Sequence, residues 1–224
     1  NYSRKKHNVK VTIIIKKNLE GFSKISPERL LDEFKKLVRS KGFLKLTKDK
    51  FCFEIINLIF PQFKNLSIFG NLNSFAKDNI DNVDFIFLIS LMIIDGSDNV
   101  DYFIYKFNIS KKDQKRLLLL NNFFSNKINN KTFSKNNLQK ILYFNEKQSL
   151  LDLINFQIFK SKKADKKLLE MIEFFKDKEP PLLPVRATTL MHKYNIPEGK
   201  KLGIMIKKIE KKWLDNNFQI SENE

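Results

Sequence analysis

The fold of this chain is decided by helical spacing, which is clearest in KKLGIMIKKIEKKWL, residues 200–214. At about 100° per residue, apolar side chains fall on one narrow stripe and lysines crowd the opposite arc. The stripe consists of Leu202, Met205, Ile206, Ile209 and Trp213. The lysines, which we call the lysine face, are Lys200, Lys201, Lys207, Lys208, Lys211 and Lys212. One side of this predicted helix packs against the protein, and the other is either a cationic binding surface or an ordinary solvated face.

The same helical spacing extends over nearly the whole chain, and strand-like alternation is scarce. Ser26, Ser110 and Ser134 each precede an apolar stripe and are predicted N-caps, the first with a proline directly after it. Residues 83–94 are apolar all round, which indicates a central helix surrounded by others. Helices are predicted over 27–41, 48–60, 72–77, 83–94, 100–107, 111–126, 135–143, 147–160, 165–176, 187–194 and 200–216. The sequence therefore predicts an all-α fold, an elongated array of short antiparallel helices.

In the helix over residues 48–60, which stops before Pro61, the spacing places Phe51, Ile55, Leu58 and Ile59 on the inward face. Breaks in the pattern near residues 42–48 and near Asn145 divide the chain, and a proline-rich stretch at 180–184 introduces the last helices. We expect three helical regions, residues 1–45, 46–145 and 146–224.

The chain is strongly basic. Its 224 residues carry 42 Lys+Arg against 25 Asp+Glu, a net charge of +17. RNA or DNA is therefore the first partner to consider, because neutralising phosphates with lysine releases condensed counterions. Most of the cations are lysines, and Lys, Asn, Ile and Phe are all favoured by A/T-rich codons. Genome composition is thus an alternative explanation for part of the charge.

Most catalytic chemistry lacks its residues here. His7 and His192 stand alone and Cys52 is the only cysteine, so neither a transition-metal cluster nor a Cys/His nucleophile pair is expected. The glycines are never clustered, which excludes a phosphate-binding glycine loop, and no Asp-x-Asp pair occurs. The apolar segment 83–94 is too short to cross a bilayer, and a lone cysteine suits a reducing compartment. We expect a cytoplasmic protein that is not inserted in a membrane.

Two segments carry family motifs. ISPERLLDEFKKL, residues 25–37, is similar to a Ser-x-Glu-Arg-Ile/Leu-x-x-Glu-Leu signature. A second segment runs from residues 183–185 through NIPEGKKLG, residues 195–203, to Trp213, and is similar to a Pro-Gly-x-x-Leu-Gly turn followed by a helix ending in Trp. Between them, LIFPQF at residues 58–63 occupies the place of a Leu-x-Pro-Glu segment. In this order and spacing, the motifs resemble the neck and tail of tRNA nucleotidyltransferases (CCA-adding enzymes) and of the closely similar bacterial poly(A) polymerases.

The resemblance implies a neck, a body and a tail for the three expected regions. It implies a chain that grips the acceptor stem of tRNA by shape and phosphate charge, with Arg186 and the lysine face as the candidate RNA-binding residues. Glu28, Arg29 and Glu33 match the neck signature, which would orient their helix against the nucleotide-selecting helix of the enzyme. The alternative for these three is the ordinary chemistry of a helix start, with acids near the positive end of the dipole.

The resemblance also has departures. The family's Gly-x-Asp-Leu turn is Ala187-Thr188-Thr189-Leu190 here, and the family's active-site motifs, including its Asp-x-Asp metal pair, would precede Asn1. We therefore expect this chain to bind no cofactor or metal and to be inactive alone, while a catalytic head domain or subunit uses Mg²⁺ with CTP and ATP. A poly(A) polymerase region and a stand-alone basic helical module for RNA or protein binding are the alternatives.

Overall fold

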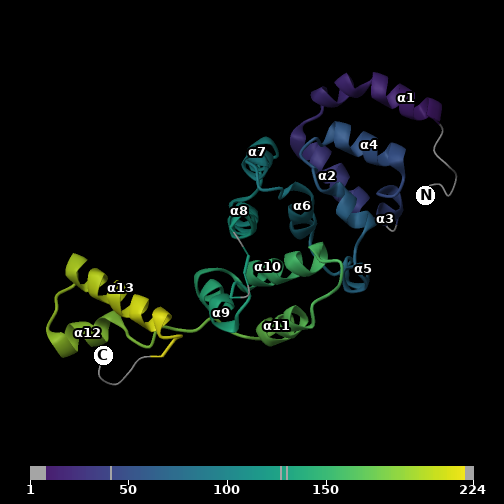
Figure 1. Ribbon diagram of the computed structural model, residues 1–224. Helices are drawn as coiled ribbons and strands as arrows, with labels where there is room; N and C mark the ends of the chain where they lie inside the picture. Colours follow the sequence, from purple (N-terminus) through teal and green to yellow (C-terminus); the bar gives the residue numbers. More distant parts are fainter. Residues whose placement is uncertain (1–8, 41, 127, 130, 220–224) are drawn as a thin grey trace. The chain divides into compact units, whose positions relative to one another are not determined.

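The computed structural model describes residues 9–40, 42–126, 128–129 and 131–219, and every regular element in them is helical (Figure 1). The prediction of an all-α fold is therefore confirmed. No helix in these residues is long and apolar enough to cross a membrane.

The chain forms two compact units. The first comprises Asn1–Ile128 with Leu151–Ile172, and the second comprises Asn129–Leu150 with Glu173–Glu224. This division differs from the three regions expected from the sequence, which stay a prediction. The elements of the first unit are α1 (Val9–Lys17), η1 (Leu19–Lys24), α2 (Pro27–Val38), α3 (Phe43–Leu46), α4 (Lys50–Ile59), η2 (Leu66–Gly70), α5 (Ser74–Asn79), α6 (Phe85–Ile93), α7 (Asn99–Lys106) and α8 (Lys111–Ser125). The second unit has α9 (Lys135–Phe144), α12 (Ala187–Tyr194) and α13 (Lys200–Asp215), and both units share α10 (Lys147–Lys160) and α11 (Lys166–Lys176).

Phenylalanine rings fill the core of the first unit beneath α2. The ring centroid of Phe34 lies 4.7 Å from that of Phe63 and 4.9 Å from that of Phe60. Phe60 and Phe63 stack on each other at 4.8 Å, and Phe103 continues the cluster at 6.2 Å from Phe63. Aromatic pairs at such distances stabilise a core beyond the area that they bury. The cluster fixes α2, which carries the motif at residues 25–37, onto the body of the unit.

Helix α6 is central, as predicted. All of its residues except Ile86 are buried, and the Asp84 side chain caps it by accepting a hydrogen bond from the Phe87 N–H at 2.8 Å. For α4 the expected inward face is wrong at two positions, because Phe51 is 38% exposed and Leu58 49% exposed. Ile56 is buried instead. Since α4 is apolar on most sides, spacing alone does not select the arc that packs.

A buried arginine ties α6, α8 and α10 together inside the first unit. Arg116 is 5% exposed, and its guanidinium lies 2.7 Å from carboxylate oxygens of both Asp84 and Asp152. A third carboxylate, Asp113, lies 3.7 Å away. Arg116 can be buried as an ion because these carboxylates compensate its desolvation. Arg116 and Asp152 are both buried between the helices that they join, whereas the side chains of Asp84 and Asp113 stay partly exposed, at 43% and 29%.

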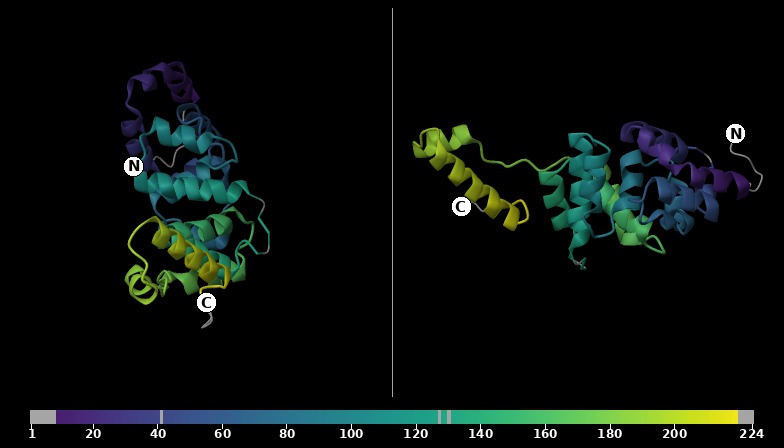
Figure 2. Two further views of the ribbon diagram at one scale, coloured as in Figure 1. Left: turned by 90° about the vertical axis from the view of Figure 1, so that its left-hand side faces the viewer. Right: turned by 90° about the horizontal axis from the view of Figure 1, so that it is seen from above.

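The second unit places α12 and α13 side by side as a helical hairpin (Figure 2). Aromatic side chains join α13 to α9. The Trp213 ring meets the Tyr143 ring edge to face at 5.4 Å and the Phe218 ring at 4.9 Å. The backbone of Phe218 is left-handed (φ 68°). Its N–H donates a hydrogen bond of 2.8 Å to the Trp213 carbonyl, which satisfies a carbonyl at the end of α13.

Candidate nucleic-acid interface

The lysine face lies on a helix whose start is set by a turn. Asn195 ends α12 in a left-handed conformation (φ 48°, ψ 44°), a backbone that asparagine adopts more readily than most residues. Gly199 precedes α13 with φ 148°, which side-chain-bearing residues rarely adopt. The predicted turn between the last two helices is therefore confirmed, and it fixes where α13 begins.

The apolar stripe of α13 packs as predicted. Leu202 and Trp213 are buried at 5% and 3% exposure, and Met205, Ile206 and Ile209 are half-buried. A hydrogen bond from the Tyr143 hydroxyl to the Glu210 carboxylate adds a polar tie between α9 and α13. With one side held in this way, the rotation of α13 about its axis is fixed.

All six lysines of the lysine face are exposed. Within the described residues, the five lysines other than Lys212 form no ion pair with a carboxylate. Lys207 with Lys211, and Lys208 with Lys212, are like charges one turn apart, an arrangement that costs about 0.2–0.5 kcal/mol per pair in a helix. The face therefore carries a self-repulsion that a bound polyanion would relieve.

The start of α13 adds to this positive potential. Lys200 and Lys201 occupy its first turn, which contains no acidic residue, and the preceding Gly199 offers no side-chain cap. The positive end of a helix dipole favours acids and disfavours lysines by a few tenths to about 1 kcal/mol each. Lys200 and Lys201 therefore lie where the helix dipole makes a positive charge unfavourable. An anion bound near them would be stabilised both by the dipole and by the two ammonium groups.

Arg186, the other candidate RNA-binding residue, is exposed directly before α12. Its backbone is extended and its side chain does not cap the helix. The structure thus shows Arg186 accessible to a ligand, and whether it acts with the lysine face stays a prediction.

The three candidate residues of the motif at residues 25–37 lie in different surroundings. Glu28 lines an open hollow of about 720 Å³ with Tyr102 and Tyr105 of α7. Glu33 instead accepts a hydrogen bond from Lys36 at 2.7 Å, and this bond lowers the pKa of Glu33. Arg29 is exposed one turn before Glu33. The helix start is capped by Ser26, whose side chain accepts from the Arg29 N–H at 3.3 Å, so the ordinary helix-start chemistry is present whatever else these residues do.

A second basic spot was missed by sequence reasoning. The ammonium groups of Lys135 and Lys178 lie 4.3 and 4.4 Å from the centroid of the Phe174 ring, which is 39% exposed. Both are cation–π contacts. Lys135 is 39 residues from Phe174 in sequence, so no local pattern signals the pair.

Among the described residues no group of three or more His, Cys, Asp or Glu side chains is arranged to hold a metal ion. The lysine face is thus an exposed cationic surface on a helix whose opposite side packs through Leu202 and Trp213. No protein-family model matches this chain, and no curated protein sequence matches it.

Proposed function

We propose that this chain holds tRNA for a tRNA nucleotidyltransferase, as the neck, body and tail of an enzyme whose catalytic head acts on the tRNA 3′ end. The observation that carries the proposal is the lysine face of α13, exposed along its whole length opposite a stripe that Leu202 and Trp213 bury. The motifs at residues 25–37 and 195–213 support the same reading of the chain.

Lysines suit this task for a physical reason. Contacts to phosphates fix the position of a nucleic acid without reading its sequence, and A-form RNA is recognised mainly by shape and backbone. A row of ammonium groups along one helix follows a phosphate backbone as a series of point charges. An acceptor stem of any sequence could thus be held in one position, which is what an enzyme acting on all tRNAs requires.

The chemistry belongs to the head in this proposal. Mg²⁺, CTP and ATP would be bound there, and no residue of this chain is assigned to them. The corresponding region of a poly(A)-adding enzyme is the alternative within the same class, because the neck and tail motifs are similar in both. We expect the chain to act in the cytoplasm.

The test is competition between RNA and DNA of equal charge. A tRNA transcript and a B-form DNA duplex with the same number of phosphates are titrated against the full chain at several salt concentrations. Recognition of A-form shape predicts that tRNA binds at least about tenfold tighter. Equal affinities with equal salt dependence would mean that the chain is a general polyanion binder.

The proposed catalytic head gives a second test. DNA upstream of the codon for Asn1, or a neighbouring gene, should encode an Asp-x-Asp pair and a Glu-Asp-x-x-Arg motif in frame. A complete coding region without either motif nearby would favour a stand-alone RNA-binding module.

A further inference from the structure

The hairpin of α12 and α13 encloses a cavity of about 250 Å³ with an apolar floor. Leu190 of α12 and Trp213 of α13 form the buried part of that floor, at 5% and 3% exposure. Met205 and Ile209, both half-buried, extend it along α13. The volume lies below the range of roughly 300–1,000 Å³ that is typical of sites for drug-sized molecules, and suits a single flat ring system.

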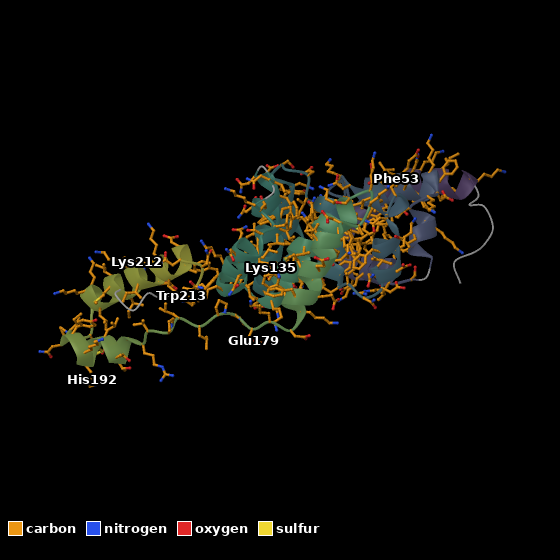
Figure 3. The ribbon with its side chains drawn as sticks, turned by 60° about the horizontal axis from the view of Figure 1, so that its bottom comes forward. Phe53, Lys135, Glu179, His192, Lys212 and Trp213 are labelled. Carbon is orange, nitrogen blue, oxygen red and sulfur yellow. The ribbon has the colours of Figure 1, made fainter. Side chains whose placement is uncertain are left out.

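The rim of this cavity is aromatic and basic. Tyr194, which is 52% exposed, lines it together with Lys193 and Lys212. The Lys193 ammonium lies 5.7 Å from the Tyr194 ring centroid, so a cation stands beside an accessible aromatic face. Figure 3 shows Lys212 and the adjacent Trp213 on α13. A ligand that fits this lining has a flat apolar body and an anionic group attached to it.

Lys212 connects the cavity to the lysine face, because it belongs to both. A phosphate backbone that follows the lysine face of α13 therefore reaches the rim of the cavity without leaving the cationic surface. A nucleobase joined to that backbone meets the stated requirements: a flat ring for the apolar floor and Tyr194, and a phosphate for the two lysines.

We propose that this cavity takes up one unpaired nucleobase of the bound RNA, stacked against Tyr194, with its phosphate held by Lys193 and Lys212. The inference rests on the proposed function and extends it, because the lysine face alone holds backbone without regard to base pairing. The site adds a preference for RNA in which an unpaired base lies beside a stem.

The experiment compares two RNA hairpins with identical stems and identical phosphate number. One ends in a short single-stranded tail of normal nucleotides, and the other ends in the same tail without bases. Thr189 lines the cavity and is exposed, so Thr189→Phe fills the space while every lysine remains. The matched control is Thr188→Phe, which adds the same ring at an exposed neighbour that does not line the cavity.

For the unsubstituted chain and Thr188→Phe, the natural tail should bind at least about fivefold tighter than the abasic tail. Thr189→Phe should abolish this difference and leave binding of a blunt stem unchanged. Trp213 is the only tryptophan, so its emission in the unsubstituted chain reports occupancy independently of any variant. The natural tail should change that emission, and the abasic tail should not.

Equal affinities for the two tails, with Trp213 emission unaffected by either, would overturn the inference. If tRNA and blunt stems still bind in that case, the proposal that the lysine face binds RNA survives, and only the assignment of a nucleobase to the cavity is wrong. If no RNA binds at all, the inference and the proposed function both fall.

Discussion

The hydroxyl of Tyr143 donates a hydrogen bond of 2.5 Å to the carboxylate of Glu210, across 67 residues of sequence. Tyr143 lies on α9 and Glu210 on α13, so this contact joins the lysine-bearing helix to the rest of its unit. It engages Glu210, one of the few acids of α13, in a hydrogen bond. The ring of Tyr143 also packs against the ring of Trp213. Substitutions at Tyr143 therefore test how α13 is attached to α9.

Tyr143→Phe should lower the free energy of unfolding by about 0.5–1.5 kcal/mol, since the ring contacts remain while a partly exposed hydrogen bond to a carboxylate is lost. Urea unfolding followed by circular dichroism measures the change. Tyr105→Phe is the matched control, because Tyr105 is 86% exposed. Equal effects of the two substitutions would show that the Tyr143 hydrogen bond contributes nothing.

The hydrogen bond should also be sensitive to alkaline pH. The hydrogen bond to Glu210, with burial as a smaller cause, raises the pKa of Tyr143 to about 12 from its usual 10.0. Because the folded-state pKa is the higher one, the contribution is complete below about pH 10 and is lost as the pH rises towards 12. The difference in free energy of unfolding between the unsubstituted chain and Tyr143→Phe should therefore shrink over this window. A constant difference would contradict the assignment.

Trp213→Ala should cost roughly 3–5 kcal/mol of stability, because it empties a site that is only 3% exposed and removes two edge-to-face ring contacts. Leu182→Ala in the same unit is the control, since Leu182 is 86% exposed and its loss should stay within about 0.5 kcal/mol. Urea unfolding followed by circular dichroism suits both variants. A small effect at Trp213 would show that the stripe does not anchor α13.

Arg116→Met should destabilise the first unit by about 3–5 kcal/mol, because Asp152 stays buried at 2% exposure without its cation. Adding Asp152→Leu to this variant should recover most of the loss, since the pair is then replaced by apolar groups of similar size. Thermal unfolding of both variants gives the comparison. A double variant that is no more stable than Arg116→Met would mean that the buried Asp152 charge is not what destabilises the single variant.

Local signals in the sequence predicted most helices. Ser26, Ser110 and Ser134 each accept a hydrogen bond from the backbone N–H three residues later, as predicted for N-caps. The helix over 147–160 has the predicted bounds, and the central helix is buried as its composition indicates. Capping and periodicity depend on residues within a few positions of each other, so one sequence is enough to see them.

Contacts between distant residues could not be predicted in this way. The Tyr143–Glu210 bond and the placing of Lys135 over Phe174 depend on how helices pack, which no local pattern specifies. The inward face of α4 was wrong at Phe51 and Leu58 because several arcs of that helix are apolar. For the candidate site, exposure of the lysine face followed from periodicity, whereas the cavity beside Tyr194 required two helices to meet.

The central claim is that the lysine face binds RNA backbone. Lys207→Gln and Lys211→Gln together remove two exposed charges without touching the buried stripe. Lys111→Gln with Lys115→Gln is the matched control, because it removes two exposed lysines with the same spacing from α8.

The decisive measurement is the slope of log affinity for tRNA against log salt concentration for these two variants. Each lost phosphate contact removes about 0.7–0.9 from the slope, so the α13 variant should flatten it by roughly one to two units while the α8 control leaves it unchanged. An α13 variant with the slope of the unsubstituted chain would contradict the account and leave the lysines as a solvated helix face.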